Sequence, residues 1–363
     1  MKVALIARST LYSGKGGDTV QIVKTAEYLR KLGVEADIIL SGEPVDYSNY
    51  DLLHFFNIIR PDDIISHVRK SNLPFVISTI YVDYSVLDMK IRGVLFRTLY
   101  SVLGRDRVEY LKAVARWIKS GEAITSKDYL LRGHRNCIRY LIQKANLMLP
   151  NSQSEINRLM KDYNCSGPFK VIPNAVDAAI FDGSNTQSGK ERKGVISVGR
   201  FEYRKNQLNL IRALKNTDHT LTLVGDPSPN QISYYEQCME EAKELGDRFK
   251  LFSFMEHDKL VELFSEQRVH VLASWFETTG LVSLEAAMQG CEIVITNRGD
   301  TEEYFGKYAF YCDPESPDSI REAVESSFKE SRLGDFQDHI RANYTWERTA
   351  EKTLQAYKEV LGE

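Results

Sequence analysis

The chain has 363 residues, with 47 lysines and arginines against 50 aspartates and glutamates, a net charge of −3. This length fits two domains of ordinary size, and a hydrophobic content of 43% excludes a disordered chain. The charge balance gives no sign of a nucleic-acid partner. Apolar runs are too short to span a bilayer, and Arg8 interrupts the first of them too early for a secretion signal. We therefore expect a cytoplasmic protein.

Five cysteines are spread along the chain without a Cys-x-x-Cys pair. This odd number and wide spacing argue against a disulfide framework and a structural zinc site, and indicate a reducing compartment. The acidic residues form no cluster with the spacing of metal ligands, so we expect no metal and no other cofactor.

Short runs rich in branched apolar residues alternate with amphipathic stretches along most of the chain. The runs predict strands at 3–7, 36–40, 52–56 and 75–79, and again at 195–198, 220–224, 249–252, 269–273 and 292–296. The amphipathic stretches, among them 20–32, 208–214 and 233–245, predict helices. Strands that alternate with helices imply parallel sheets covered on both faces. Two such series predict two doubly wound α/β domains.

The boundary between the two series is a polar stretch rich in glycine, serine and asparagine that begins at Asp182. We place a linker at 182–193, after an N-terminal domain of residues 1–181 and before a C-terminal domain of residues 194–345. A helix at about 346–361 closes the chain, with no strand after it.

Residues 86–146 depart from this alternation, because they have an almost wholly helical pattern with 13 basic and 5 acidic residues. The rest of the chain then carries a net charge of −11. Apolar residues at helical spacing form two stripes, Ile91, Val94, Leu95, Thr98, Leu99 and Val102, then Leu111, Val114, Ala115 and Ile118. The pattern fits an ordinary pair of surface helices, and it also fits a basic amphipathic contact with an anionic membrane.

Residues 273–290 are the most informative stretch for chemistry. A strand ends there, a tight loop carries Glu277, and Thr279 can cap a helix that starts at about Gly280. The carboxyl end of an open α/β sheet is where ligands bind, and the start of a helix favours anions. The first amides of this helix belong to Gly280, Leu281 and Val282.

A second glutamate, Glu285, follows about one and a half turns into this helix, so its side chain can reach back along the same face. A lone helical glutamate is usually solvated. Two glutamates that flank a strand–loop–helix turn indicate a binding site.

The strand at 195–198 runs into Gly199 and Arg200, and Lys205 follows five residues later. Arginine presents a planar fork and lysine a point charge, which is a usual pair for a diphosphate. Near the N-terminus, Gly16 and Gly17 lie between the first strand and the first helix, where glycine lets backbone amides approach a phosphate. Their spacing matches neither the dinucleotide fingerprint nor the P-loop.

Together these pieces resemble the retaining GT-B glycosyltransferases of family 4, the glycosyl transferases group 1, over nearly the whole chain. The resemblance rests on the early Gly-Gly loop, the Gly-Arg…Lys-Asn pair and motifs at 51–54, 149–152, 172–177, 223–226 and 344–347. Its most specific element is Glu277…Glu285, followed by the strand at 292–296 and Gly299. It implies two Rossmann-like doubly wound domains facing each other across a cleft, the first on the acceptor side and the second binding the donor. Helix 346–363 would cross back onto the first domain.

The resemblance also implies roles at the donor diphosphate. Arg200 and Lys205 match the pair that holds this group. The backbone amides of Gly280, Leu281 and Val282 match those around it, and Gly16 and Gly17 match the loop that closes over the donor.

For the rest of the donor, the resemblance gives each glutamate its own role. Glu285 matches the carboxylate that accepts the ribose hydroxyls, and Phe254 lies where the main chain of the family meets the base. Glu277 matches the carboxylate that orients the hydroxyls of the donor sugar, with Thr278 and Thr279 beside it.

The resemblance is imperfect on the acceptor side. The family often has a histidine after the strand that ends near Thr79, and Tyr81 takes this place here, which makes Asp83 the nearest carboxylate. We therefore take Glu277 and Asp83 as the candidate catalytic residues. His54 fits the Asp-x-x-His run of the family, but a packed strand-end histidine is the interpretation we favour.

The resemblance implies a retaining, metal-independent hexosyltransferase that moves a sugar from a nucleotide-diphosphate donor, UDP favoured over GDP, to an acceptor hydroxyl. Such enzymes commonly assemble bacterial surface polysaccharides, so we expect a glycan or lipid-linked acceptor at the inner face of the plasma membrane. The alternatives are a GT-B-type sugar-nucleotide epimerase and a non-catalytic sugar-nucleotide-binding protein. A glycoside hydrolase would also use two carboxylates but has no need of a diphosphate pair.

Overall fold

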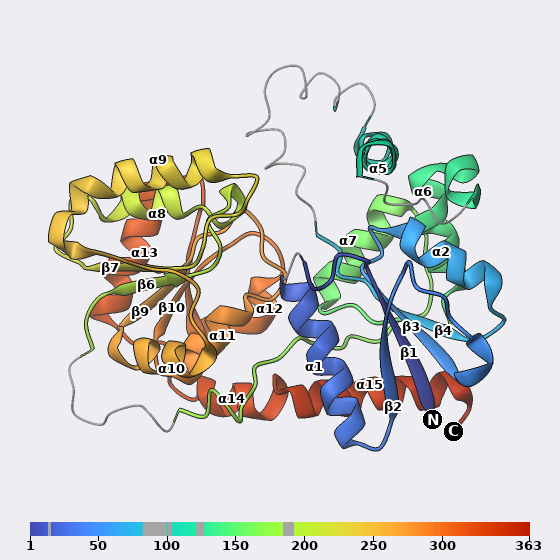
Figure 1. Cartoon of the computed structure of the whole chain (residues 1–363). Coiled ribbons are helices and arrows are strands. Elements are labelled where there is room, and N and C mark those ends of the chain that lie inside the picture. The colour runs from blue at the N-terminus through green and yellow to red at the C-terminus, as the bar shows by residue number, and fades with distance from the viewer. Residues whose placement is uncertain (14–15, 83–99, 101–103, 121–126, 184–191) are drawn as a thin grey trace. The chain divides into compact units, whose positions relative to one another are not determined.

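The computed structural model describes residues 1–13, 16–82, 100, 104–120, 127–183 and 192–363 (Figure 1). Two compact units make up the chain, the first from Met1–Asn174 with Trp346–Glu363 and the second from Ala175–Thr345. Residues 175–181, which we assigned to the N-terminal domain, thus pack with the second unit. Residues 184–191 of the expected linker lie outside the described residues.

The first unit contains a parallel sheet with the strand order β2-β1-β3-β4-β5. Its strands are β1 (Lys2–Ala7), β2 (Glu35–Leu40), β3 (Leu52–Phe56), β4 (Phe75–Ser78) and β5 (Leu147–Met148). All residues of β3 and β4 are buried. These strands are continuous apolar runs because helices cover both faces of a parallel sheet.

The helices of this unit pack in two groups, α1 with α15 and α2 with α6, and α6 also contacts α5 and α7. They are α1 (Gly17–Lys31), α2 (Pro61–Lys70), α5 (Arg105–Ser120), α6 (Lys127–Lys144), α7 (Gln153–Tyr163) and α15 (Trp346–Leu361), with the 3-10 turn η1 (Tyr47–Asn49). The helical pattern of α6 breaks at Gly133, whose φ of 74° is left-handed. The closing helix α15 therefore belongs to the first unit, although it follows the second in sequence.

The second unit contains a parallel sheet with the strand order β11-β10-β9-β6-β7-β8. Its strands are β6 (Val195–Val198), β7 (Leu221–Val224), β8 (Phe249–Phe252), β9 (Val269–Leu272), β10 (Glu292–Thr296) and β11 (Ala309–Cys312). Its helices are α8 (Gln207–Leu214), α9 (Ile232–Ala242), α10 (His257–Glu266), α11 (Leu281–Met288), α12 (Thr301–Phe305), α13 (Pro317–Lys329) and α14 (Phe336–Asn343), with 3-10 turns η2 (Tyr203–Lys205), η3 (Lys243–Arg248) and η4 (Gly306–Tyr308).

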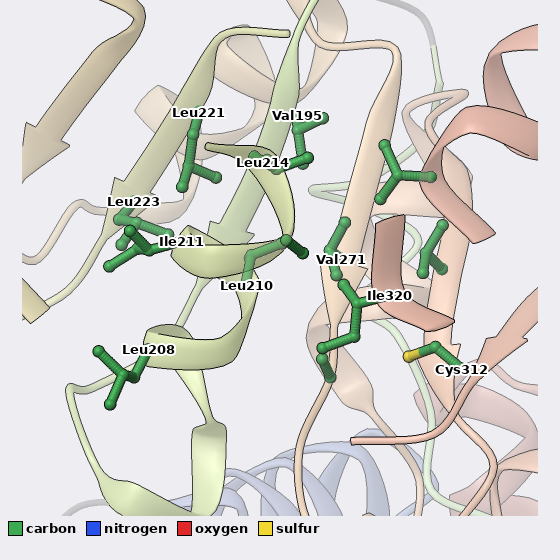
Figure 2. Packing of buried hydrophobic residues seen from close by; sticks show 14 of the residues in the cluster. Val195, Leu208, Leu210, Ile211, Leu214, Leu221, Leu223, Val271, Cys312 and Ile320 are labelled. Carbon is green, nitrogen blue, oxygen red and sulfur yellow. The ribbon is translucent and has the colours of Figure 1, made fainter. Parts of the chain in front are cut away.

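The core on one face of this sheet is shown in Figure 2. Leucine and isoleucine side chains of α8 pack against strand residues such as Leu221 and Leu223, and Ile320 of α13 belongs to the same cluster. A second cluster, with α10, α11 and α14, covers the other face. The two apolar clusters hold the sheet as a rigid base for the loops at its carboxyl edge.

The architecture confirms the prediction of two parallel-sheet α/β domains. All nine predicted strands are present, with ends that differ by at most one residue. The short strands β5 and β11, each at one end of its sheet, were not predicted. The expected helix at 233–245 is instead α9 followed by η3.

The strand order of the second sheet determines where a ligand can bind. From β6 the chain proceeds to β7 and β8 on one side, and then returns to β9 on the other side of β6. The loops after β6 and β9 therefore leave the sheet in opposite directions and open a crevice between them. Such a switch point is the usual ligand site of an open α/β sheet.

Candidate functional site

The predicted donor-binding residues gather at this switch point. Arg200 and Lys205 follow β6, and Glu277 follows β9, its paired neighbour. The loops after β6 and β7 approach closely, because a Cβ atom on Gly225 would lie 2.3 Å from the carbonyl oxygen of Gly199. Gly225 also has a φ of 144°, so no other residue fits there without moving Gly199 and Arg200.

The loop that carries Glu277 is held against the loop after β10. The Glu277 amide donates to the carbonyl of Arg298 (3.2 Å), and the Asp300 amide donates to the carbonyl of Glu277 (2.8 Å). A Cβ atom on Gly299 would lie 1.9 Å from that Glu277 oxygen, and the φ of Gly299 is 107°. Gly299 is thus the residue that allows the backbone of Glu277 to dock, and this docking fixes where the carboxylate points.

Glu277 and Lys205 form an ion pair, with 2.6 Å between Nζ and Oε1, although 72 residues separate them in sequence. Glu277 is only 8% exposed. Burial alone would raise the pKa of this carboxyl, but the charges of Lys205 and Arg204 outweigh it and lower the pKa below its ordinary value. The site therefore holds a fixed, ionised carboxylate beside a lysine cation.

Arg200 lies at a more open position. Its guanidinium is 2.9 Å from Glu202, and its side chain is 41% exposed. Arg204 bonds to the other oxygen of the same carboxylate. Glu202, which the sequence did not single out, therefore holds two arginines at the carboxyl end of β6.

The start of α11 supplies backbone donors. Its N-cap is Gly280 in a left-handed conformation (φ 74°), and no side chain caps it, so the predicted capping role of Thr279 is wrong. Thr279 is buried and Thr278 half-buried in the loop before it. Within the described residues, the amides of Gly280, Leu281 and Val282 donate no backbone hydrogen bond, as the first turn of a helix requires. These amides are available to an anion.

Glu285 lies in the second turn of α11 and is half-buried. Burial, together with the nearby carboxylate of Asp177, raises the pKa of Glu285 from its ordinary 4.5 to about 7. In the part of the chain that the structure describes, its carboxylate accepts no hydrogen bond. A desolvated acceptor without a protein donor is suited to the hydroxyls of a ligand.

Phe254 follows β8 and is 68% exposed. Its amide donates to Oδ1 of Asp226 at 3.3 Å, so Asp226 ties the loop after β8 to the loop after β7. Phe254 therefore presents an aromatic ring to solvent from the same edge of the sheet.

The remaining predicted residues belong to the first unit. Gly16 is the N-cap of α1 and Gly17 its first residue, in the loop after β1. The loop is braced by an ion pair of Arg8 with Asp18, at 2.6 Å. Asp83 lies outside the described residues.

Tyr81, which takes the place of the expected histidine, is fully buried. Its amide donates to Glu155 (2.7 Å) and its hydroxyl to Asp162 (2.6 Å), and the hydroxyl accepts from Arg105 (2.8 Å). Glu155, completely buried on α7, also accepts from the hydroxyl of Thr79. Glu155, which no sequence motif singled out, organises the loop after β4.

His54 is a structural histidine, as expected. Its ring nitrogens bond to the hydroxyls of Tyr357 (2.6 Å) and Ser78 (2.9 Å). Burial lowers its pKa to about 3, so the ring is neutral. The bond to Tyr357 anchors the closing helix α15 to β3.

Other expectations concern metals, thiols and membranes. The described residues include no group of three or more His, Cys, Asp or Glu placed to hold a metal ion. The five cysteines are free thiols. No helix in the described part of the chain has the length and apolar character to cross a membrane.

Comparison with protein families matches residues 182–344 to "Glycosyl transferases group 1". An uncharacterized glycosyltransferase of Methanocaldococcus jannaschii is 28% identical, covering 99% of this chain and 98% of its own. A D-inositol 3-phosphate glycosyltransferase of Corynebacterium urealyticum is 22% identical, and the match covers 99% of this chain and 95% of the relative. An N-acetylgalactosaminyltransferase of Campylobacter jejuni is 23% identical, and the match covers 89% of this chain and 90% of the relative. Its name includes a diphospho-undecaprenol compound.

Solved structures give the same result at the level of the fold. Sucrose-phosphate synthase from Thermosynechococcus elongatus matches with a TM-score of 0.76 at 15% identity, over 99% of both chains. HepE of Anabaena in complex with UDP and glucose matches with a TM-score of 0.67 at 16% identity, also over 99% of both. The chain thus has the fold of the GT-B glycosyltransferases, and its second unit matches the glycosyl transferases group 1 family.

Proposed function

We propose that this protein is a retaining glycosyltransferase that uses a nucleotide-diphosphate sugar. The observation that carries the proposal is the arrangement at one switch point of Arg200, the Lys205–Glu277 pair and the open amides of α11. This set offers cations and amides to a diphosphate and a fixed carboxylate to the sugar next to it.

The cations and amides perform the chemistry by stabilising charge. When the bond from the anomeric carbon to the diphosphate breaks, negative charge grows on the departing oxygens. Arg200, Lys205 and the first amides of α11 stabilise this charge from positions set before the reaction, which is the usual source of catalytic power in such sites. We propose that protein cations take the role that a metal ion has in other transferases.

Glu277 is proposed to orient the sugar rather than to attack it. Its lowered pKa keeps it an acceptor for sugar hydroxyls at neutral pH. Its bond to Lys205 and the docking of its backbone hold it in one place. Retention through front-face attack needs no protein nucleophile, so this role is compatible with the proposed reaction.

UDP is the favoured nucleotide of the donor, and a phosphorylated molecule the favoured acceptor. The UDP complex of HepE supports the first choice. For the acceptor, two relatives are named for an inositol phosphate and a diphospho-undecaprenol compound. We propose a glycan or lipid-linked acceptor in polysaccharide assembly. The relatives are named as transferases, which favours transfer over the epimerase and the non-catalytic binding protein.

The proposal predicts that Arg200→Ala and Lys205→Ala each weaken UDP binding about tenfold, because each removes a charge-assisted bond of about 1.5–3 kcal/mol. Calorimetric titration with UDP and GDP measures the loss. Arg321→Ala, which removes a half-buried arginine of α13 that pairs with Asp318, is the matched control and should bind as wild type. Unchanged affinity of both site variants for every nucleotide would exclude this diphosphate site.

We also propose reversible contact of the basic segment 86–146 with an anionic membrane. The first apolar stripe, 91–102, lies outside the described residues except for Tyr100. In the second stripe Leu111 is 46% exposed, and Leu131 on α6 is 85% exposed. The core contacts of α5 come instead from Val108 and Ala113. These exposed leucines on α5 and α6 support the membrane interpretation over a plain surface helix pair.

Sedimentation with vesicles tests this contact. We expect binding to vesicles with anionic lipid but not to neutral ones, and loss of binding at high salt, because each basic residue near an anionic surface contributes about 1 kcal/mol within a Debye length. Lys112→Glu with Leu131→Ser should weaken it. Equal behaviour toward both vesicle types at low salt would contradict the proposal.

A further inference from the structure

Two consecutive amide side chains, those of Asn206 and Gln207, directly follow Lys205, and the proposed donor site gives them no role. Each residue is only 4% exposed. They lie where the turn η2 ends and α8 begins, and α8 is anchored in the apolar core of the second unit (Figure 2). Buried amides are normally hydrogen-bonded, so their partners show which parts of the molecule they hold together.

The side chain of Asn206 joins three segments of the second unit. Its Nδ2 group donates to the carbonyl oxygen of Ala273 at 2.9 Å and to that of Pro314 at 2.8 Å. Ala273 directly follows β9, and Pro314 lies in the loop after β11. The segment that ends in Lys205 is thereby tied to the loop that carries Glu277.

The backbone of Asn206 suits this clamp and not a helix cap. Asn206 is the N-cap residue of α8, a position at which an asparagine side chain usually accepts from the first turn, but here it makes no such bond. Its φ of 60° is left-handed, which asparagine and glycine tolerate best. A backbone bond from the Trp275 amide to the Arg204 carbonyl, at 2.9 Å, joins the same two loops. The asparagine thus holds loops together at the expense of capping its own helix.

The side chain of Gln207 holds the loop of the other cation. Its Nε2 group donates to the carbonyl oxygen of Arg200 at 2.9 Å and reaches that of Gly199 at 3.4 Å. Its Oε1 atom accepts from the hydroxyl of Tyr234 at 3.4 Å, and this hydroxyl in turn accepts from the Leu208 amide at 3.1 Å. The amide is therefore fixed at both ends while it holds the backbone of Arg200.

The two cations need such support because neither lies in a strand or an α-helix. Arg200 belongs to the loop after β6, and Lys205 to the short turn η2. Loops place side chains less precisely than regular elements do, unless bonds from neighbouring residues fix them. Stabilisation of a departing diphosphate requires charges that are in position before the reaction. The start of α8 supplies one fixed amide for each of the two loops.

We propose that Asn206 and Gln207 are positioning residues of the donor site, Asn206 for Lys205 and Gln207 for Arg200. The inference rests on the proposed glycosyltransferase function and names the residues that hold its two diphosphate cations in place. Each amide acts through its cation, so its loss weakens the binding of the diphosphate and not that of the nucleoside.

Calorimetric titration of the full chain with UDP, and with uridine as a ligand that lacks the diphosphate, tests the proposal. Asn206→Gly keeps the left-handed backbone and removes the clamp, and Gln207→Met keeps a long side chain without a donor. Each variant should weaken UDP binding about fivefold, the net worth of about one hydrogen bond, and leave uridine binding unchanged.

Double variants separate positioning from general support of the fold. In a Lys205→Ala background, Asn206→Gly should cause no further loss of UDP affinity, because the lysine that it positions is gone. In an Arg200→Ala background it should cause the same fivefold loss as in wild type. Gln207→Met should show the reverse pattern. Two residues that act through different cations give additive losses, whereas residues that act through the same one do not.

Asn209→Ala on α8 is the matched control. Its Nδ2 group also donates to the Pro314 carbonyl, at 2.9 Å, but it holds neither cation loop, so it should bind UDP as wild type does. Thermal melting checks that the variants fold, and each of the two arms decides for its own residue.

The outcomes distinguish this inference from the proposed function. Equal losses of UDP affinity from Asn206→Gly in both backgrounds, a parallel loss of uridine affinity, or the same loss in Asn209→Ala would overturn the inference and leave the donor site standing. If Arg200→Ala and Lys205→Ala both bind UDP as tightly as wild type, the proposed function fails instead.

Discussion

Glu277→Gln should lower the turnover of sugar transfer by about 10²–10³-fold and leave the affinity for UDP within about twofold of wild type. Glutamine keeps the volume of the side chain and an oxygen that can accept from Lys205, which lies 2.6 Å away. It removes the negative charge that is proposed to hold the sugar as the bond to the diphosphate breaks. Losing one preorganised electrostatic contact in an active site commonly costs this much.

Steady-state kinetics and UDP titration of the same preparation measure the two effects separately. Glu322→Gln on the exposed face of α13 serves as a control and should change neither. Glu277→Ala should also melt at a lower temperature, because it leaves the largely buried Lys205 without its carboxylate. A parallel loss of UDP affinity in Glu277→Gln would show that this residue binds the nucleotide and not the sugar.

Glu285→Gln should weaken UDP-glucose binding about 100-fold while making the protein more stable at pH 8. The resemblance implies that the Glu285 carboxylate accepts the ribose hydroxyls, and losing two such hydrogen bonds, at about 1.5–3 kcal/mol each, would account for the weaker binding. The gain in stability follows from the pKa of about 7. Above this pH the folded protein must hold a desolvated charge, and glutamine removes that cost.

The pH dependence follows from the same shift. Between pH 4.5 and 7 the unfolded chain loses the Glu285 proton while the folded chain retains it, so this group lowers the stability of the fold as the pH rises to about 7. Glu285→Gln should therefore have the same melting temperature as the wild-type protein at pH 4.5. At pH 8 its melting temperature should be several degrees higher than that of the wild type. Thermal melts at both values measure this difference, and equal melting temperatures at pH 8 would contradict the raised pKa.

The fold was largely predictable because most of its strands are buried on both faces, with β2 and β8 as exceptions. Continuous branched apolar runs, such as those of β1 and β10, leave little ambiguity when helical patterns separate them. The strand β5 was missed because two residues are too short to show a pattern. The strand β11 was missed although its four residues are as many as those of β6, which was predicted. In α6 the glycine at 133 breaks the helix, yet the apolar spacing on either side of it continues.

The candidate site was predictable in its residues but not in its contacts. Local motifs located Arg200, Glu277 and Glu285, since each follows a strand at the expected edge. The bond between Lys205 and Glu277 joins loops 72 residues apart, so no local pattern could show it.

The capping prediction failed for a more local reason. Thr279 is the kind of residue that caps helices, and Gly280 after it was expected to lie within the first turn. The left-handed backbone of Gly280 shifts the start of α11 by one residue. This conformation favours glycine, and a Cβ atom there would lie 3.0 Å from Ile295 and 3.4 Å from Leu272.

The central claim is that this protein transfers a sugar from a nucleotide donor with retention. Proton NMR of the anomeric signal during the first turnovers, with UDP-, GDP- and ADP-sugars and a set of phosphorylated acceptors, tests it directly. We expect release of the nucleoside diphosphate, preferably UDP, and an α-linked product from an α-linked donor. The turnover of Glu277→Gln should not exceed about one hundredth of the wild-type value. A β-linked product, or an epimer formed without any acceptor, would contradict it.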